Sequence, residues 1–143
     1  MSKVIAINIS KEKGVIKNPI EKGFFKINHG LYGDAHAGNW HRQVSLLGIE
    51  SIKKMKAIGI DFITTGQFAE NITTEGLILY ELSVGTKLKI GEVLFEVTQI
   101  GKECHKGCKI KDLVGECVMP KEGIFTKVLK EGYIKTGDEI VVV

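Results

Sequence analysis

Apolar and polar residues alternate along much of the chain, which is the pattern of half-buried β-strands. Ile5, Ile7 and Ile9 predict a first strand whose apolar side chains share one face. Further short strands are predicted around two groups: Phe25 with Ile27, and Val44 with Leu46 and Leu47. With 17 glycines but only two prolines to punctuate these runs, the sequence favours a mainly β class.

The clearest element is a hairpin from Lys87 to Ile100. Its two alternating runs flank the pair Gly91-Glu92, and glycine readily adopts the positive φ of tight hairpin turns. A related pattern recurs, since residues 84–90 and 136–142 each pass from a glycine turn into an alternating strand. Two such corners suggest a barrel.

One amphipathic helix is predicted from Gly48 to Ile58, with apolar residues at successive i+3 steps and Gly59 as its terminator. Shorter helical turns are predicted at 77–82 and 111–114. Many short strands with few helices favour a compact, closed or nearly closed antiparallel β-barrel, and residues 1–143 are expected to form a single domain.

Composition narrows the class of protein. A 143-residue chain with 43% hydrophobic residues can bury a core without disulfide bonds. No apolar run reaches the ~18 residues of a membrane-spanning helix, and the N-terminus lacks a signal-peptide pattern. The net charge of +3 comes from lysines scattered among acidic residues, which suits a small anionic ligand better than a nucleic acid. We therefore expect a cytoplasmic protein with neither a membrane nor a nucleic-acid partner.

The loop after the predicted hairpin carries the strongest chemical signal. Residues 102–109 place Lys102, His105 and two further lysines around Cys104 and Cys108. Nearby cations lower the pKa of a thiol and so favour the nucleophilic thiolate. We predict Cys104 and Cys108 as catalytic thiols. Two alternatives remain: cysteines that act as ordinary small apolar residues, or a zinc site formed by the cysteines and the histidine of residues 104–117.

A second polar loop, residues 28–42, holds three of the four histidines and several glycines. Glycines allow close approach of the backbone to a ligand, and His36, His41 and Arg42 are suited to binding a phosphate or another oxyanion. The alternative is a long surface loop with solvated histidines.

A third polar stretch, residues 64–74, leads into another predicted strand. Glu70 and Asn71 are its candidate binding residues. A threonine-rich strand edge with a turn-favouring asparagine is the alternative interpretation.

Together these segments resemble the MOSC family, named after the C-terminal domain of molybdenum cofactor sulfurases, and in particular its short stand-alone bacterial members. The resemblance rests on motifs in the same order along nearly the whole chain. These are Gly33-Asp34-Ala35-His36-Ala37-Gly38, then residues 41–47, Phe68-Ala69-Glu70-Asn71-Ile72, and residues 84–91, 98–104, 115–120, 123–125 and 137–140.

The resemblance implies a barrel-like β fold and a family cysteine, best matched by Cys104, that carries sulfur as a persulfide or ligates molybdenum. Asp34, His36, His41, Arg42, Glu70, Asn71 and Lys102 are then the expected residues for a molybdopterin-type molybdenum cofactor.

Larger members of the family carry a fused pyridoxal-phosphate desulfurase-like domain, which this sequence lacks. A partner cysteine desulfurase is therefore expected to supply sulfur, and a molybdenum enzyme or cofactor-assembly protein to accept it. The resemblance also allows a molybdenum-dependent reductase of N-hydroxylated compounds. A zinc-stabilised interaction module is the third possibility.

Overall fold

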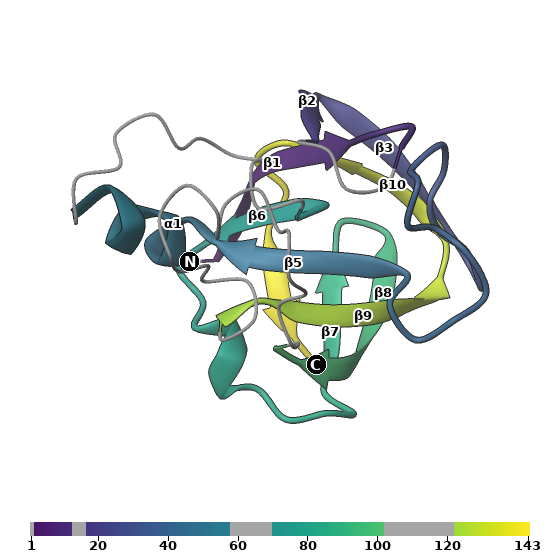
Figure 1. Cartoon of the computed structure of the whole chain (residues 1–143). Helices are drawn as coiled ribbons and strands as arrows, with labels where there is room; N and C mark the ends of the chain where they lie inside the picture. The colour runs from purple at the N-terminus through teal and green to yellow at the C-terminus, as the bar shows by residue number, and fades with distance from the viewer. Residues whose placement is uncertain (1, 13–16, 58–69, 102–121) are drawn as a thin grey trace.

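A computed structural model describes residues 2–12, 17–57, 70–101 and 122–143 (Figure 1), with side chains of the helix described as far as Lys53. The described part is mainly β with one short α-helix, as predicted. Its elements are β1 (Lys3–Ile9), β2 (Asn18–Ile20), β3 (Lys22–Lys26), β4 (Gly30–Leu31), β5 (Val44–Gly48), α1 (Ile49–Ala57), β6 (Ile72–Glu75), the 3₁₀ turn η1 (Leu79–Glu81), β7 (Lys87–Ile90), β8 (Val93–Ile100), β9 (Ile124–Lys130), β10 (Gly132–Lys135) and β11 (Ile140–Val142).

Eight strands form one sheet in the order β11-β7-β8-β9-β5-β6-β1-β2. The prediction of a closed or nearly closed barrel is wrong, because no ladder between described residues joins the two ends of this sheet. Strand β2 pairs with residues 7–9 of β1, so only the first part of β1 can meet the segment before β11. That meeting consists of one isolated bridge, between Lys3 and Glu139, and a few backbone hydrogen bonds that join residues 2–4 to residues 137–140.

The sheet is also not purely antiparallel, because β5 and β6 pair in parallel with Leu46 opposite Ile72. A parallel pair needs a long crossover connection. Helix α1 begins directly after β5 and supplies part of that crossover (Figure 1). Its bounds agree with the predicted helix to within one residue at each end. The predicted terminator Gly59 and the predicted turn at 111–114 lie outside the described residues.

The predicted hairpin is confirmed, with Leu88 opposite Phe95 and Gly91 at a φ of 56°. The two glycine corners are confirmed as well, since Gly85 and Gly137 have φ values of 95° and 93°. The strands that follow them, β7 and β11, pair with each other. The predicted turn at 77–82 contains η1.

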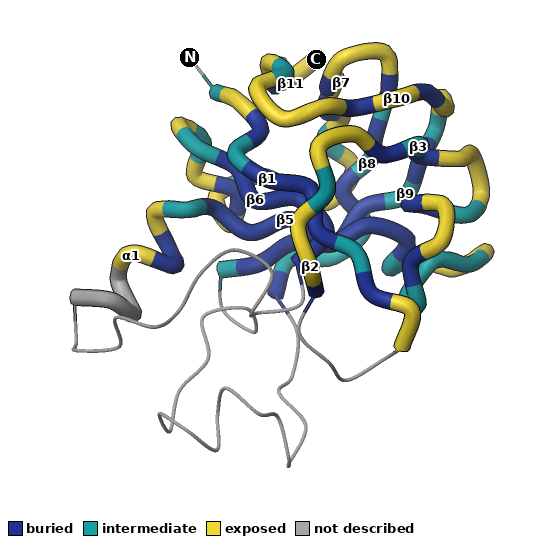
Figure 2. The backbone as a smooth tube through the Cα atoms, turned by 90° about the horizontal axis from the view of Figure 1, so that it is seen from above, coloured by how far each residue is buried: buried dark blue, intermediate teal, exposed yellow. Residues whose placement is uncertain are grey.

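A second sheet of three strands, in the order β10-β3-β4, packs against the larger one. Phe25 of β3 meets Phe95 of β8 edge to face, with ring centroids 5.7 Å apart. The interior strands are buried and the turns around them are exposed (Figure 2). Two predictions of apolar positions are wrong. Ile27 lies beyond the end of β3 and is 42% exposed, and a bulge between Val4 and Ala6 directs Val4 rather than Ile5 into the core.

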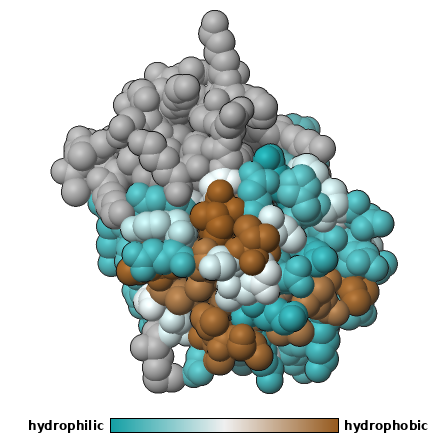
Figure 3. Space-filling model, turned by 90° about the horizontal axis from the view of Figure 1, so that it is seen from below, coloured by the Kyte–Doolittle hydropathy of each residue, from teal (hydrophilic) through white to brown (hydrophobic). Residues whose placement is uncertain are grey.

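Exposed apolar side chains are interspersed with polar ones on the face shown in Figure 3. Such scattered apolar surface is usual for a folded domain and needs no partner to explain it. In the described part of the chain, no helix is long and apolar enough to cross a membrane.

Candidate functional site

The loop between β4 and β5 is narrow at its base. Gly30 has a φ of 111°, and a Cβ at this position would lie 2.4 Å from the backbone oxygen of Gln43. Gln43 is itself fixed, because its side-chain oxygen accepts a hydrogen bond from the backbone nitrogen of Val128 on β9. Only glycine therefore allows the two ends of the loop to approach so closely.

Inside the loop, Asp34 forms a buried ion pair with Lys17. Lys17 Nζ lies 2.7 Å from Asp34 Oδ1, and neither side chain is exposed to solvent. Lys17 Nζ also donates to Ser10 Oγ at 3.2 Å, and the backbone nitrogen of Ser10 donates to Asp34 Oδ1 at 3.0 Å. The carboxylate thus anchors the loop to the end of β1.

The ionisation of Asp34 follows from these contacts. Burial by itself raises the pKa of the carboxyl group, because a charge is less stable away from water. The hydrogen bond and positive charge of Lys17, with hydrogen bonds from the Asn71 side chain and the Ser10 backbone, outweigh burial and hold the pKa of Asp34 below its ordinary value. Asp34 is therefore a charged structural anchor at neutral pH.

His36 and Trp40 extend this anchor along the loop. His36 Nδ1 lies 3.0 Å from Lys17 Nζ, and the backbone nitrogen of His36 donates to Asp34 Oδ2 at 3.2 Å. Trp40 Nε1 donates to the backbone oxygen of His36 at 2.9 Å. The Trp40 ring then meets the ring of His41 edge to face. His36 and His41, five positions apart in the sequence, are thus connected through contacts with Trp40.

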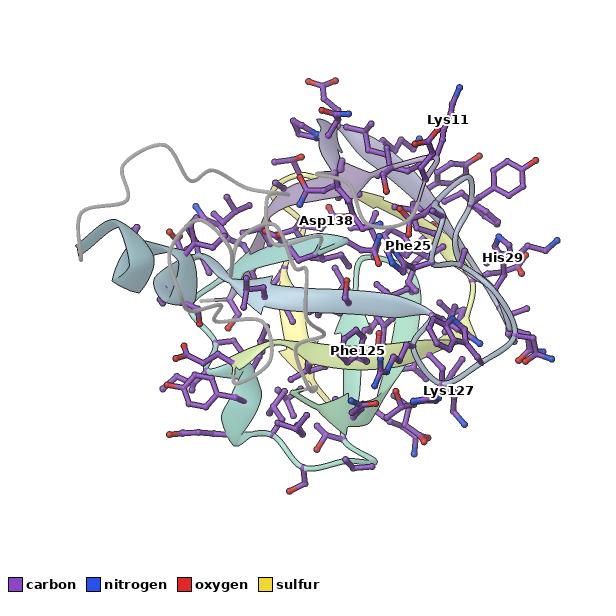
Figure 4. The ribbon with its side chains drawn as sticks, in the orientation of Figure 1. Lys11, Phe25, His29, Phe125, Lys127 and Asp138 are labelled. Carbon is purple, nitrogen blue, oxygen red and sulfur yellow. The ribbon has the colours of Figure 1, made fainter. Side chains whose placement is uncertain are left out.

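His41 and Arg42 converge on the end of β8. His41 Nε2 and Arg42 Nε lie 3.1 and 3.0 Å from Gln99 Oε1. Gln99 Nε2 donates to the backbone oxygen of Gly101, which orients the amide so that its oxygen faces the two donors. The Arg42 guanidinium lies over the ring of Phe125, 5.0 Å from its centroid, and Figure 4 shows Phe125 on β9.

Asn71 joins the loop to the sheet. Its Oδ1 accepts from the backbone nitrogen and the hydroxyl of Ser45 on β5, and its Nδ2 donates to the backbone oxygen of Asn8 on β1. Glu70, the preceding residue, is fully buried and accepts a 2.7 Å hydrogen bond from the Thr73 hydroxyl. A polar, largely buried row therefore crosses β1, β6 and β5 and continues through Asp34 into the loop.

A family model for the MOSC domain matches residues 33–141 of the 143-residue chain. The chain belongs to the MOSC family. Among solved structures, this MOSC protein is similar to the YuaD protein from Bacillus subtilis, with a TM-score of 0.80 and 20% identity over 98% of this chain and 94% of that one.

Two further structures are similar to this MOSC protein. YiiM from Geobacillus stearothermophilus has a TM-score of 0.77 and 21% identity, over 100% of this chain and 75% of that one. YiiM from Escherichia coli has a TM-score of 0.72 and 19% identity, over 100% and 70%. At such identities the likeness shows the fold alone. No curated protein matches this sequence.

The predicted cofactor residues of the MOSC domain are only partly brought together. Asp34, His36 and Asn71 share one hydrogen-bonded network, and His41 and Arg42 are joined to it through Trp40. Glu70 is linked to this network through Thr73, whose hydroxyl donates to Glu70 and accepts from the side chain of Asn8.

Lys102 and the predicted thiols, Cys104 and Cys108, lie outside the described residues, as does the suggested zinc site. Among the residues that are described, no group of three or more histidine, cysteine, aspartate or glutamate side chains is arranged to hold a metal ion. The two described stretches that end at residue 101 and resume at residue 122 are joined to each other, because the backbone nitrogen of Gly101 donates to the backbone oxygen of Gly123 at 2.7 Å.

Sequence reasoning missed Lys17, Gln99 and Phe125 as members of the site. Lys17 is one of many lysines, and its neighbours in sequence give no sign that it is buried. Gln99 lies within the predicted hairpin, where a glutamine side chain is ordinarily solvated. Phe125 follows an apolar residue and is typical of a core strand. Their roles depend on partners far away in the sequence.

Proposed function

We propose that this MOSC domain binds the phosphate-bearing, molybdopterin-type cofactor through residues 34–42 and carries sulfur on Cys104 for delivery to a molybdenum centre. The observation that supports an anionic ligand is the setting of Arg42, the only arginine of the chain. Its Nε donates to Gln99 and its guanidinium carbon lies over the ring of Phe125, so the guanidinium group is held in place.

The terminal nitrogens of Arg42 donate to no group in the described part of the chain. No carboxylate of the described residues lies within ion-pair distance of them either. A guanidinium group whose terminal N–H donors have no acceptor among the described residues is suited to bidentate binding of a phosphate. The residues present therefore fit an anionic cofactor, whose molybdenum would supply the redox or sulfur-accepting chemistry when bound.

The Lys17–Asp34 pair complements this arrangement. Because the two buried charges compensate each other, they add rigidity to the loop without adding net charge. His36 is held beside them with its side chain 32% exposed.

Cys104 is proposed as the sulfur carrier because of the family match and because of its position in the sequence. It follows Gly101 by three residues, and three residues span at most about 11 Å. In the proposed step, the Cys104 thiolate attacks the terminal sulfur of a persulfide on a cysteine desulfurase. A new S–S bond forms on Cys104, the S–S bond of the donor breaks, and the donor cysteine leaves as a thiolate.

Intact-mass spectrometry tests the carrier role after incubation with a cysteine desulfurase and cysteine. Wild-type protein should gain one sulfur atom that dithiothreitol removes. Cys104→Ser should gain none, while Cys117→Ser, the matched control, should behave as wild type. Absence of the adduct on wild-type protein would refute the carrier role, and its retention in Cys104→Ser would refute the choice of residue.

The anion site has its own test, because Trp40 is the only tryptophan and lies next to His41. Inorganic phosphate should change its fluorescence. We expect Arg42→Gln to weaken phosphate binding at least ~10-fold, since a charge-assisted hydrogen bond contributes about 1.5–3 kcal/mol. The exposed Lys130→Gln should bind as wild type. Equal affinities in the two variants would contradict the assignment.

Elemental analysis of protein made in a host that synthesises the cofactor separates the alternatives. Stoichiometric molybdenum together with turnover of a hydroxylamine-type substrate would indicate a reductase of N-hydroxylated compounds. Stoichiometric zinc together with unfolding by a chelator would indicate an interaction module.

A further inference from the structure

Two lysines lie directly opposite each other on the outer face of the small sheet. Lys22 on β3 pairs with Lys135 on β10. The next pair along, Thr136 with Glu21, is hydrogen-bonded, because the Thr136 backbone nitrogen donates to the Glu21 backbone oxygen. The two kinds of pair alternate in an antiparallel ladder, so the lysines form a non-hydrogen-bonded pair, at which side chains are closest. Like charges in this position lower the stability of a sheet.

Aromatic side chains lie next to the two lysines. Tyr133 is directly opposite Phe24, and their rings meet edge to face with centroids 5.0 Å apart. Lys22 Nζ lies over the Tyr133 ring, 4.4 Å from its centroid, yet Tyr133 remains 52% exposed. Tyr32, whose backbone nitrogen donates to the Phe24 oxygen, is 67% exposed at the opposite edge of the sheet. Aromatic surface and positive charge are therefore combined on one small sheet.

The positive charge of this face is not compensated within the domain. Among the residues that the structure describes, no carboxylate lies within ion-pair distance of the Lys22 or Lys135 ammonium group. Two acidic side chains close to β10 accept hydrogen bonds from the main chain instead. Asp138 accepts from the backbone nitrogen of Lys135, and Glu131 accepts from that of Ile27. The two ammonium groups are therefore accessible to an anionic group from outside.

We propose that the outer face of the small sheet, formed by Lys22, Phe24, Tyr133 and Lys135, is a docking surface for an acidic segment of a partner protein. A carboxylate of the segment binds between the two ammonium groups, and an adjacent apolar side chain covers the aromatic pair. Tyrosine is enriched among the residues that dominate protein interfaces, and charges beside them select partners of opposite charge.

A protein segment fits this face better than a nucleic acid does. Together with the exposed Lys26 of β3, the face has three lysines and can neutralise about three phosphates, whereas nucleic-acid binding with strong salt dependence involves about 6–10 phosphate contacts. The surface includes neither residues 34–42 nor Cys104. Its test is therefore independent of the proposed function.

A short synthetic peptide of alternating glutamate and tyrosine is the probe. In ¹H–¹⁵N NMR spectra of the full chain, it should cause saturable shifts of the backbone amide signals of β3 and β10. Binding should weaken as salt is added, because exposed charges are screened. Saturable shifts confined to another part of the domain, or no shifts, would overturn the proposal.

Two double variants test the lysine pair. Lys22→Gln with Lys135→Gln should bind the peptide at least ~5-fold more weakly, the combined effect of two exposed charge contacts. Lys87→Gln with Lys89→Gln is the matched control, since it removes two exposed lysines of β7, and it should bind as wild type. Equal affinities of the two double variants would overturn the assignment of the surface.

Two further probes test the class of partner. A peptide of alternating glutamate and serine has the same charge without aromatic side chains and should bind at least ~5-fold more weakly, because an interface of this kind depends on its buried aromatic contacts. Equal binding of the two peptides would overturn the role of the aromatic pair. A single-stranded oligonucleotide of equal net charge should bind more weakly than the glutamate–tyrosine peptide, and tighter binding on this face would overturn the choice of a protein partner.

Discussion

Replacement of Lys17 by methionine tests how far the buried ion pair supports the fold. Methionine keeps much of the side-chain volume but removes the charge, so the Asp34 carboxylate is left without its cation. At 2.7 Å and an effective dielectric constant near 20, the Coulomb attraction between the two groups is about 6 kcal/mol. Much of this attraction offsets the cost of taking both charges out of water, whereas removing one partner leaves that cost exposed.

We expect Lys17→Met to lower the free energy of unfolding by about 3–5 kcal/mol. For a domain of this size, that loss corresponds to a fall in Tm of roughly 10–15 °C. The double variant with Asp34→Asn should lose less than Lys17→Met alone, because no unpaired charge remains. Urea denaturation of the wild type, both single variants and the double variant gives the coupling energy between the two side chains.

Lys3→Met is the matched control. Lys3 lies 3.7 Å from Glu75, with side chains 53% and 40% exposed. An exposed ion pair of this kind contributes about 0–1 kcal/mol. Comparable losses for Lys17→Met and Lys3→Met, or a coupling energy below about 1 kcal/mol for the buried pair, would refute the reasoning.

Two further predictions concern the same loop. The pKa of the Asp34 carboxyl group is lower in the folded than in the unfolded protein, so the stability that this group contributes is complete above the unfolded pKa near 3.9 and is lost as the pH falls toward the folded pKa. Urea titrations at several pH values should therefore show that the free energy of unfolding falls more steeply below about pH 4 for wild type than for Asp34→Asn. Equal slopes of the two proteins would contradict this prediction. Gly30→Ala should cost about 2–5 kcal/mol in the same assay, because backbone strain is joined by a clash with the Gln43 backbone oxygen. Gly85→Ala has a similar φ of 95° with open space around it and should cost only about 1–2 kcal/mol, so equal losses would argue against a tight loop base.

Local periodicity accounts for what the sequence predicted correctly. The β7–β8 hairpin and helix α1 are defined by residues close together in the chain, so their patterns are visible without any knowledge of the fold. Closure of the sheet depends instead on which distant strands pair. Nothing in the composition of β5 and β6 shows that they run parallel, or that β2 occupies the edge of β1 that a barrel would need.

The residues of the candidate site likewise fall into those that the sequence identifies and those that it does not. His36, Arg42 and Asn71 were identified because their residue types are suited to binding an anion and lie in glycine-rich or polar segments. Lys17 could not be identified from the sequence, because its burial depends on Asp34, 17 positions away. The role of Gln99 likewise depends on the approach of Arg42, 57 positions away. A residue whose function comes from a distant partner leaves no local pattern.

The two best-defined cations of the site are suited to different tasks. The compact ammonium group of Lys17 lies within hydrogen-bond distance of Ser10, Asp34 and His36. Because the group is buried, its removal lowers the stability of the fold, and it is therefore suited to holding the loop and the His36 ring in place. The guanidinium group of Arg42 is planar, donates to Gln99 through Nε and lies over the ring of Phe125, so the direction of its terminal N–H donors is fixed. A ligand therefore meets a rigid guanidinium group instead of a flexible one, and less conformational entropy is lost on binding. Because Asp34 is already compensated by Lys17, it does not oppose the anion that Arg42 attracts.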